Sequence, residues 1–243
     1  MDLSTSALGA AALMVFLGAL VQTSVGFGMA VVAAPILYLI EPRMVPVPLL
    51  VMITAISAYS LWRTYSHLHL AELSSAFVGR IPGIALAMVL LSYSSGGVLP
   101  LLIGLSVLSM VAASLTSIHF TPTRNRLFVA GLASGFMGTA TAIGGPAMAL
   151  VYQHADGERI RANLSAYFLL GALMSLCGLA LIGRIGEAEL LLSAGMLPPT
   201  VAGMLAGRFA VRFLGPAVVR PAILGLSSIA GCAVVLEWLL GRQ

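Results

Sequence analysis

Two stretches of this sequence place small hydroxyl and amide side chains beside glycines, inside long apolar runs. Their members are Gln22, Thr23, Ser24, Gly26, Phe27 and Gly28 in the first stretch, and Thr139, Thr141, Gly144, Gly145 and Pro146 in the second. Hydroxyl and amide groups donate hydrogen bonds without carrying a charge, and glycines let the backbone approach a ligand closely. Such a set suits reversible binding of a small oxyanion, because the ligand can leave again.

Each stretch also interrupts what would otherwise be one very long helix. A break in a helix exposes backbone N–H groups at the new N-terminus, with the positive end of the helix dipole behind them. In a bilayer, irregular backbone persists only where it is buried in protein or lines a cavity. We therefore expect the two breaks to face each other and to form the substrate site.

Two further polar residues are candidates for this site. Arg80 lies inside an apolar run, where an ionisable group is a functional candidate, although its side chain could instead reach the membrane interface. Asn163 lies at the start of another run and could face the cavity or cap a helix. The glycines of the second stretch also have a simpler interpretation as close helix–helix contacts, at Gly131, Gly135 and Gly138.

The segments that carry these residues have the composition of membrane spans. The sequence is 60% hydrophobic and only 8% charged, and its mean hydropathy is +1.06. Because a span needs about 20 apolar residues, the sequence predicts an all-α polytopic membrane protein with about eight spans. The expected helices are 6–24 with 28–39, 45–61, 72–91, 98–117, 127–152 with a break at 139–146, 163–182, 190–213 and 217–240.

The pattern of the first half recurs in the second. Residues 1–118 and 127–243 each contain four predicted spans, the first of which is broken, and the polar linker 119–126 separates them. A shift of 116 places Arg43 on Arg159 and Pro82 on Pro198. Repeats with matching interruptions indicate the binding site of a secondary transporter. Four spans per half would make the repeats parallel, whereas re-entrant breaks would make them inverted, and the loop arginines do not decide the orientation.

The ordered set of motifs resembles the sulfite exporter (TauE/SafE) family over nearly the whole chain. The resemblance lies in Gly26-Phe27-Gly28 with Pro35, in Ile143-Gly144-Gly145-Pro146, and in Arg161-Ala-Asn-Leu164. The sequence departs from the family at Met29, Ala30 and Ala142, where glycines are usual, so the lining is bulkier. The resemblance implies two four-helix halves and transport of small sulfur anions, such as sulfite, sulfoacetate or other organosulfonates, across a bacterial inner membrane.

Other functions are disfavoured by what the sequence contains. The 12 basic residues are all arginines scattered between apolar runs, which is not a nucleic-acid-binding patch. His67 and His69 have no Cys or carboxylate cluster beside them, so we expect neither a metal site nor a cofactor. An intramembrane enzyme would need a His deep in a span. A channel, or a transporter of small carboxylates, stays open as an alternative.

The expected partners are therefore a small anionic substrate and the lipid bilayer, and a homodimer is left open. Coupling to protons or another ion is also left open, because Glu72 and Glu237 lie near the ends of spans. We expect any proton coupling to act through protonation of the substrate itself.

Overall fold

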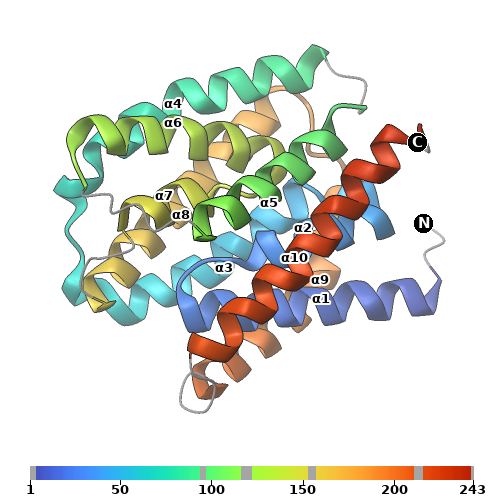
Figure 1. The fold of residues 1–243 in the computed structure, drawn as a ribbon, viewed down its shortest axis with the longest axis horizontal. Helices are drawn as coiled ribbons and strands as arrows, with labels where there is room; N and C mark the ends of the chain where they lie inside the picture. Colours follow the sequence, from blue (N-terminus) through green and yellow to red (C-terminus); the bar gives the residue numbers. More distant parts are fainter. Residues whose placement is uncertain (1–3, 94–96, 116–121, 153–156, 211–215, 242–243) are drawn as a thin grey trace.

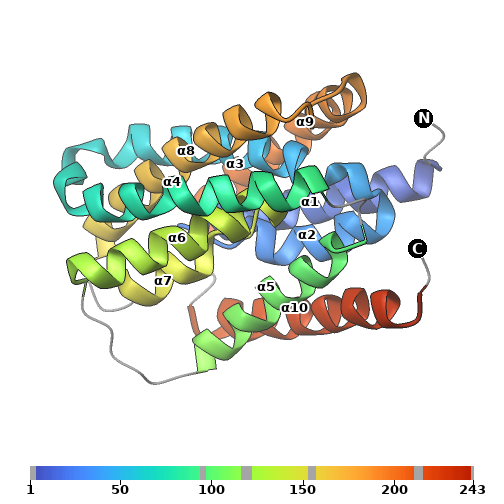
Figure 2. The same cartoon turned by 90° about the horizontal axis from the view of Figure 1, so that it is seen from above.

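The computed structural model describes residues 4–93, 97–115, 122–152, 157–210 and 216–241. Its regular elements in these ranges are helices. They are α1 (Thr5–Val25), α2 (Met29–Ile40), η1 (Pro42–Met44), α3 (Val47–Thr64), η2 (Tyr65–His67), α4 (Leu70–Tyr93), α5 (Leu99–Leu115), α6 (Arg124–Thr141), α7 (Gly145–Tyr152), α8 (Gly157–Leu181), α9 (Glu187–Ala210) and α10 (Pro216–Leu239). Figures 1 and 2 show them gathered into one elongated bundle.

The all-helical fold class is confirmed, and five helices are long and apolar enough to cross a membrane: Thr5–Ser24, Pro42–His67, Leu70–Tyr93, Gly157–Leu181 and Glu187–Phe209. Shorter apolar helices accompany them in the described residues. Several expected boundaries differ from the structure by two or more residues, and two of these differences concern polar segments. α6 begins at Arg124, inside the expected linker, and α8 begins at Gly157, before the expected span that starts at residue 163. Both segments continue a helix N-terminally with polar residues, which a hydropathy pattern does not detect.

Each broken run doubles back on itself instead of continuing across the bundle. Gly18 of α1 lies beside Met29 and Ala33 of α2, and Gly138 of α6 lies beside Gly144 at the start of α7. Figure 1 shows α2 returning toward the end at which α1 begins, and α7 returning toward the start of α6. The sequence left open whether the broken runs are re-entrant, and in the structure both are.

Contacts between helix ends define the two ends of the bundle. Toward one end, Arg161 at the start of α8 donates to the Ser24 carbonyl of α1 at 2.9 Å, and the Ser24 hydroxyl donates to the Gly207 carbonyl of α9 at 3.3 Å. The α3–α4 connection joins this end through the His69 amide, which donates to Asn163 at 2.9 Å. We call it the arginine-rich end, because it carries Arg63, Arg124, Arg126, Arg159, Arg161 and Arg208.

The opposite end collects the other helix termini. There Arg184, after α8, donates to the Leu91 carbonyl near the end of α4, and Trp238 of α10 donates to the Gly97 carbonyl at 2.7 Å. We call it the acidic end, because it carries Glu41, Glu187, Glu189 and Glu237. Helices α1, α3 and α9 thus run away from the acidic end, and α4, α6 and α8 run toward it (Figure 1).

Helices α4 and α6 approach so closely that glycines are required at their contact. A Cβ atom on Gly131 would collide with the Ala76 carbonyl of α4, and one on Gly135 would lie 2.5 Å from the Arg80 carbonyl. Close packing of this kind is how helices associate where no hydrophobic effect operates between them. Gly131 and Gly135 therefore serve as close helix–helix contacts. This contact also holds α4, and with it Arg80, against the second broken run.

Replacing Gly131 with Ala is expected to force α4 and α6 apart. Overpacking of this kind destabilises a protein by ~1–3 kcal/mol, which exceeds the gain in helix propensity. A lowered midpoint temperature of unfolding in detergent checks this. The control is Gly195→Ala on α9, where a Cβ meets nothing within 4 Å. Equal midpoints for both variants would contradict the close contact.

Candidate functional site

The first turn of the site joins α1 to α2 through two glycines in left-handed conformations. Gly26 has φ +96° and Gly28 has φ +115°, values that side chains larger than hydrogen rarely adopt. The Gly26 amide donates to the Gln22 carbonyl at 2.7 Å and ends α1. The Gln22 side chain spans the break, because its Oε1 accepts from the Met29 amide at 3.3 Å and its Nε2 donates to Ser57 of α3 at 3.4 Å.

The second turn, between α6 and α7, is built with an alanine in the corresponding left-handed position. Ala142 has φ +63° and its amide donates to the Gly138 carbonyl at 3.0 Å. Thr141 accepts from the Ile143 amide at 3.2 Å, and Ser134 of α6 donates to the Gly144 carbonyl at 2.7 Å. Hydroxyl groups thus hold this turn in a conformation that costs a non-glycine residue energy.

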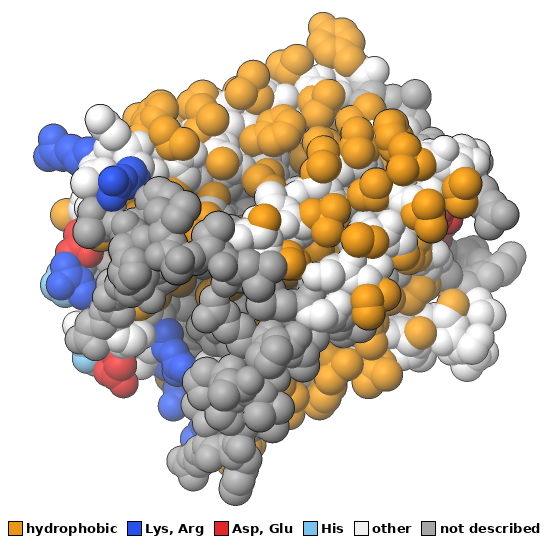
Figure 3. All heavy atoms as spheres, in the orientation of Figure 1, with side chains coloured by type: hydrophobic (Ala, Val, Ile, Leu, Met, Phe, Trp, Pro, Cys, Tyr) orange, Lys and Arg blue, Asp and Glu red, His pale blue; other side chains and the backbone are white. Residues whose placement is uncertain are grey.

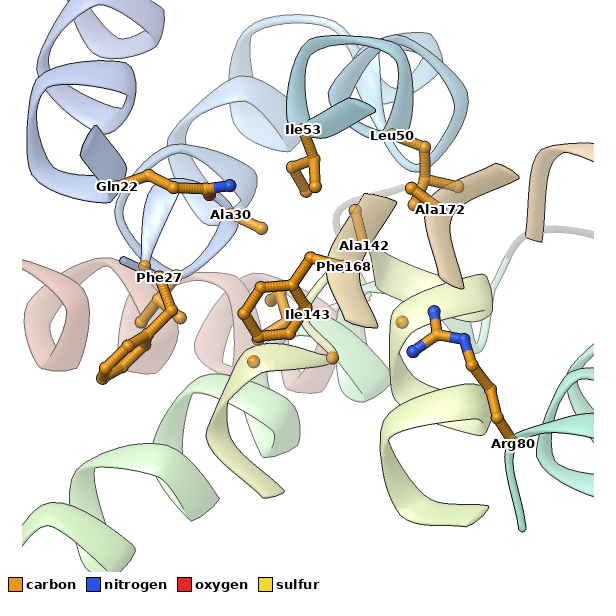
Figure 4. A pocket seen from close by; sticks show the side chains of 15 residues that line it. Gln22, Phe27, Ala30, Leu50, Ile53, Arg80, Ala142, Ile143, Phe168 and Ala172 are labelled. Atoms are coloured by element: carbon orange, nitrogen blue, oxygen red, sulfur yellow. The ribbon is translucent and has the colours of Figure 1, made fainter. Parts of the chain in front are cut away.

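The two turns meet around a small cavity, shown in Figure 4. Its volume is about 30 Å³, room for about two water molecules. The lining combines both turns with side chains of α3, α4 and α8: Gln22, Phe27, Gly28, Ala30, Val31, Leu50, Ile53, Arg80, Gly138, Ala142, Ile143, Gly144, Gly145, Phe168 and Ala172. The N-terminal ends of α2 and α7 both border it, so their dipoles add positive potential to one space.

Arg80 brings a full positive charge to this cavity. The residue is only 3% exposed, so its side chain does not extend to the membrane interface. Its Nη1 donates to Ser134 at 3.2 Å and its Nη2 to Ser175 of α8 at 3.3 Å, while the guanidinium carbon lies 5.0 Å from the centre of the Tyr167 ring. In the described part of the chain these partners are neutral, and the buried Nε has no hydrogen-bond partner.

A glycine of α8 makes room for that guanidinium. A Cβ atom on Gly171 would lie 2.6 Å from Nε and 2.7 Å from Nη1 of Arg80. On the other side, a Cβ on Gly138 would lie 3.3 Å from Nη2. In the view of Figure 4 the Phe168 ring lies between Arg80 on one side and Gln22 with Phe27 on the other. The position of the charge is therefore set by space on α6 and α8 as well as by α4.

Six of the residues expected at the site line the cavity: Gln22, Phe27, Gly28, Arg80, Gly144 and Gly145. The others lie around it. Thr139 pairs with Ser175 at 2.8 Å, Thr141 shapes its own turn, and Ser24 bonds to backbone carbonyls. Gly26, Thr23 and Pro146 lie in or next to the turns without lining the cavity, and the Thr23 hydroxyl is buried without a partner.

Asn163 lies elsewhere, at the arginine-rich end. Its Oδ1 accepts from the His69 amide at 2.9 Å and its Nδ2 donates to Glu72 at 3.2 Å, while Glu72 also pairs with Arg159. This cluster joins the start of α4 to the start of α8 and so links the two halves of the chain. Asn163 does not line the cavity, and its Oδ1 bonds to a backbone amide next to the start of α4.

Sequence reasoning did not single out the apolar lining or the partners of Arg80. Leu50, Ile53, Phe168 and Ala172 lie in ordinary apolar runs, so nothing in their pattern distinguishes them from other core residues. Ser175 carries a weak signal, since a fully buried serine in an apolar helix needs a polar partner. That signal does not say which partner it has.

The comparison with known proteins agrees with the geometry. Residues 11–234 match the model of the family described as sulfite exporter TauE/SafE. Searches of the curated proteins and of the solved structures found no match. The match spans nearly the whole chain and includes both turns, Arg80 and the helices that bury it. This helical, multi-pass membrane chain belongs to the sulfite exporter TauE/SafE family of transporters.

Proposed function

We propose that this chain is a secondary transporter that binds a small sulfur-containing anion between its two turns, near the bilayer midplane. Sulfite, sulfoacetate and other organosulfonates are the substrates that we propose, and a bacterial inner membrane is the proposed location. Family membership supports transport of sulfur anions in general. The finer proposal rests on one observation, the buried Arg80 whose partners in the described residues are neutral.

A buried cation without a counter-charge is costly, so its retention needs a compensating anion during part of the working cycle. Arg80 faces a cavity that two helix N-termini also border, and these groups favour the same sign of ligand charge. The small volume means that a sulfonate fits only if the turns separate or side chains move. Such movement is what alternating access to a central site requires.

An anion channel is the second candidate, and a carboxylate transporter the third. A channel conducts without saturation, whereas a transporter saturates and exchanges substrate. Nothing in the cavity distinguishes a sulfonate from a carboxylate by charge alone, so measured flux decides among these candidates. We regard an intramembrane enzyme as less favoured, because the histidines lie in or beside loops.

Leucine at Gly28 or Gly144 is expected to abolish saturable flux of sulfite, sulfoacetate or taurine into proteoliposomes, with sulfate as a further test anion. Gly28 has φ +115°, and a Cβ on Gly144 would lie 2.8 Å from the Ser134 carbonyl oxygen, so both substitutions distort a turn. Gly195→Leu, in open space on α9, serves as the matched control. Wild-type flux in correctly folded Gly28 and Gly144 variants would remove the turns from the site.

Changes to Arg80 are expected to act on substrate affinity. Losing a charge-assisted hydrogen bond should raise KM roughly tenfold to a hundredfold in Arg80→Gln. Gly171→Ala should raise KM as well, because the added methyl group displaces the guanidinium. Arg80→Lys should restore part of the affinity, which a merely structural role would not predict. An unchanged KM in Arg80→Gln, with the fold intact, would refute the role.

Proton coupling, if present, is proposed to act through the substrate's own protonation, because the cavity lining contains no carboxylate among the described residues. Uptake driven by a pH gradient should therefore survive in Glu72→Gln and in Glu237→Gln, measured with the same proteoliposomes. Abolition of pH-driven uptake, with downhill exchange retained, would show instead that a protein carboxylate carries the proton.

A further inference from the structure

The re-entrant turns sort the charged side chains of the described residues between the two ends of the bundle. Within residues 4–210, the described part of the arginine-rich end carries six arginines against Glu72 and Glu158, a formal charge of +4. The acidic end carries Arg43 and Arg184 against four glutamates, a formal charge of −2. Arg80 belongs to neither end. Figure 3 shows blue guanidinium groups gathered at one side of the visible face, next to a broad orange apolar surface.

The six arginines at this end are exposed. Arg63 lies 5.9 Å from the Tyr59 ring and Arg208 lies 5.7 Å from the Phe209 ring, so two of the guanidinium groups have aromatic surfaces beside them. Arg159 is ion-paired to Glu72. The two glutamates at this end, Glu72 and Glu158, are outnumbered by the six arginines. The arginine-rich end therefore presents a net positive surface to whatever lies outside the protein.

Aromatic side chains mark the same end as a membrane interface. Trp62 and Tyr65 flank Arg63 and are 73% and 70% exposed. Trp and Tyr at the boundary of an apolar surface lie at headgroup level in membranes, and adjacent arginines contact lipid phosphates. At the acidic end, Arg43 is already held by Glu41, with N–O distances of 2.9 and 3.0 Å, so its charge is compensated within the protein.

From this segregation we infer that the arginine-rich end lies in the cytoplasm, against the anionic phospholipid headgroups of the inner leaflet. Cytoplasmic loops of membrane proteins carry an excess of Lys and Arg, and the negative surface potential of that leaflet attracts them. The acidic end then faces the opposite side of the membrane. This orientation follows from charge and topology alone, whatever the substrate.

One consequence concerns a second cavity, at the acidic end. It measures about 220 Å³, and Tyr38, Arg43, Arg184 and Glu189 are among its lining residues. In the inferred orientation this larger cavity faces away from the cytoplasm, whereas the Glu72–Arg159 pair and Asn163 join the halves on the cytoplasmic side. The inferred orientation thus places this cavity and its charged lining on the outer side of the membrane.

Cysteine labelling in intact cells tests the orientation. The native Cys177 and Cys232 are exposed and are first replaced with Ala. Single cysteines are then introduced as Ser66→Cys at the arginine-rich end and Glu187→Cys at the acidic end, both at exposed positions. A membrane-impermeant maleimide should label the Glu187 variant in intact cells and the Ser66 variant only after permeabilisation. The reverse pattern would overturn the inference.

Arginine variants test whether the charges set this orientation. Arg63→Gln, Arg124→Gln and Arg126→Gln combined should let a measurable fraction of Ser66→Cys molecules become labelled in intact cells. Arg43→Gln is the matched control at the acidic end and should leave the labelling pattern unchanged. Unchanged labelling in the triple variant would refute the role of the anionic leaflet, and labelling of both cysteine positions in the starting protein would refute a single orientation.

Discussion

The fold depends on the need to satisfy every backbone polar group in a bilayer that offers no water. Two chain reversals inside the apolar part of the molecule would be untenable if either faced lipid. Here the second turn is buried, Phe27 of the first turn lies beside Gly145 of α7, and side chains from their own helices complete the hydrogen bonds of both turns, as Gln22 does for Met29 and Ser134 does for Gly144. The cavity exists because these two irregular segments must share one interior.

Arg80 extends the same constraint from backbone to side chain. Arg80 is only 3% exposed, so its N–H groups need hydrogen-bond acceptors inside the protein and its guanidinium needs space. The chain supplies two serines, an aromatic ring and two glycines. These groups come from α6 and α8, so the site is formed only when α4 packs on both. Because α4 and α6 meet through Gly131 and Gly135, the same close contact that joins the helices also fixes the charge beside the cavity.

The doubling back of the broken runs also governs the molecule as a whole. A single span would end on the opposite side of the membrane, whereas a hairpin returns the chain to the side on which it began. Every later helix therefore runs in the direction opposite to the one it would have after a single span. The loop arginines then collect at one end and most of the glutamates at the other. The difference in charge between the two ends is therefore a product of the turns, and not of local sequence bias.

The sequence by itself determined the helical, multi-pass class, most helix boundaries, the positions of both breaks and the family resemblance, because hydropathy and glycine placement are local properties. It also indicated Arg80, since an ionisable group inside an apolar run is conspicuous. Tertiary structure alone decided that the breaks are re-entrant, that Asn163 bonds to Glu72 and does not line the cavity, and that Gly171 makes room for Arg80. Those facts depend on which helix faces which, and residues far apart in the chain carry no local signal of their contact.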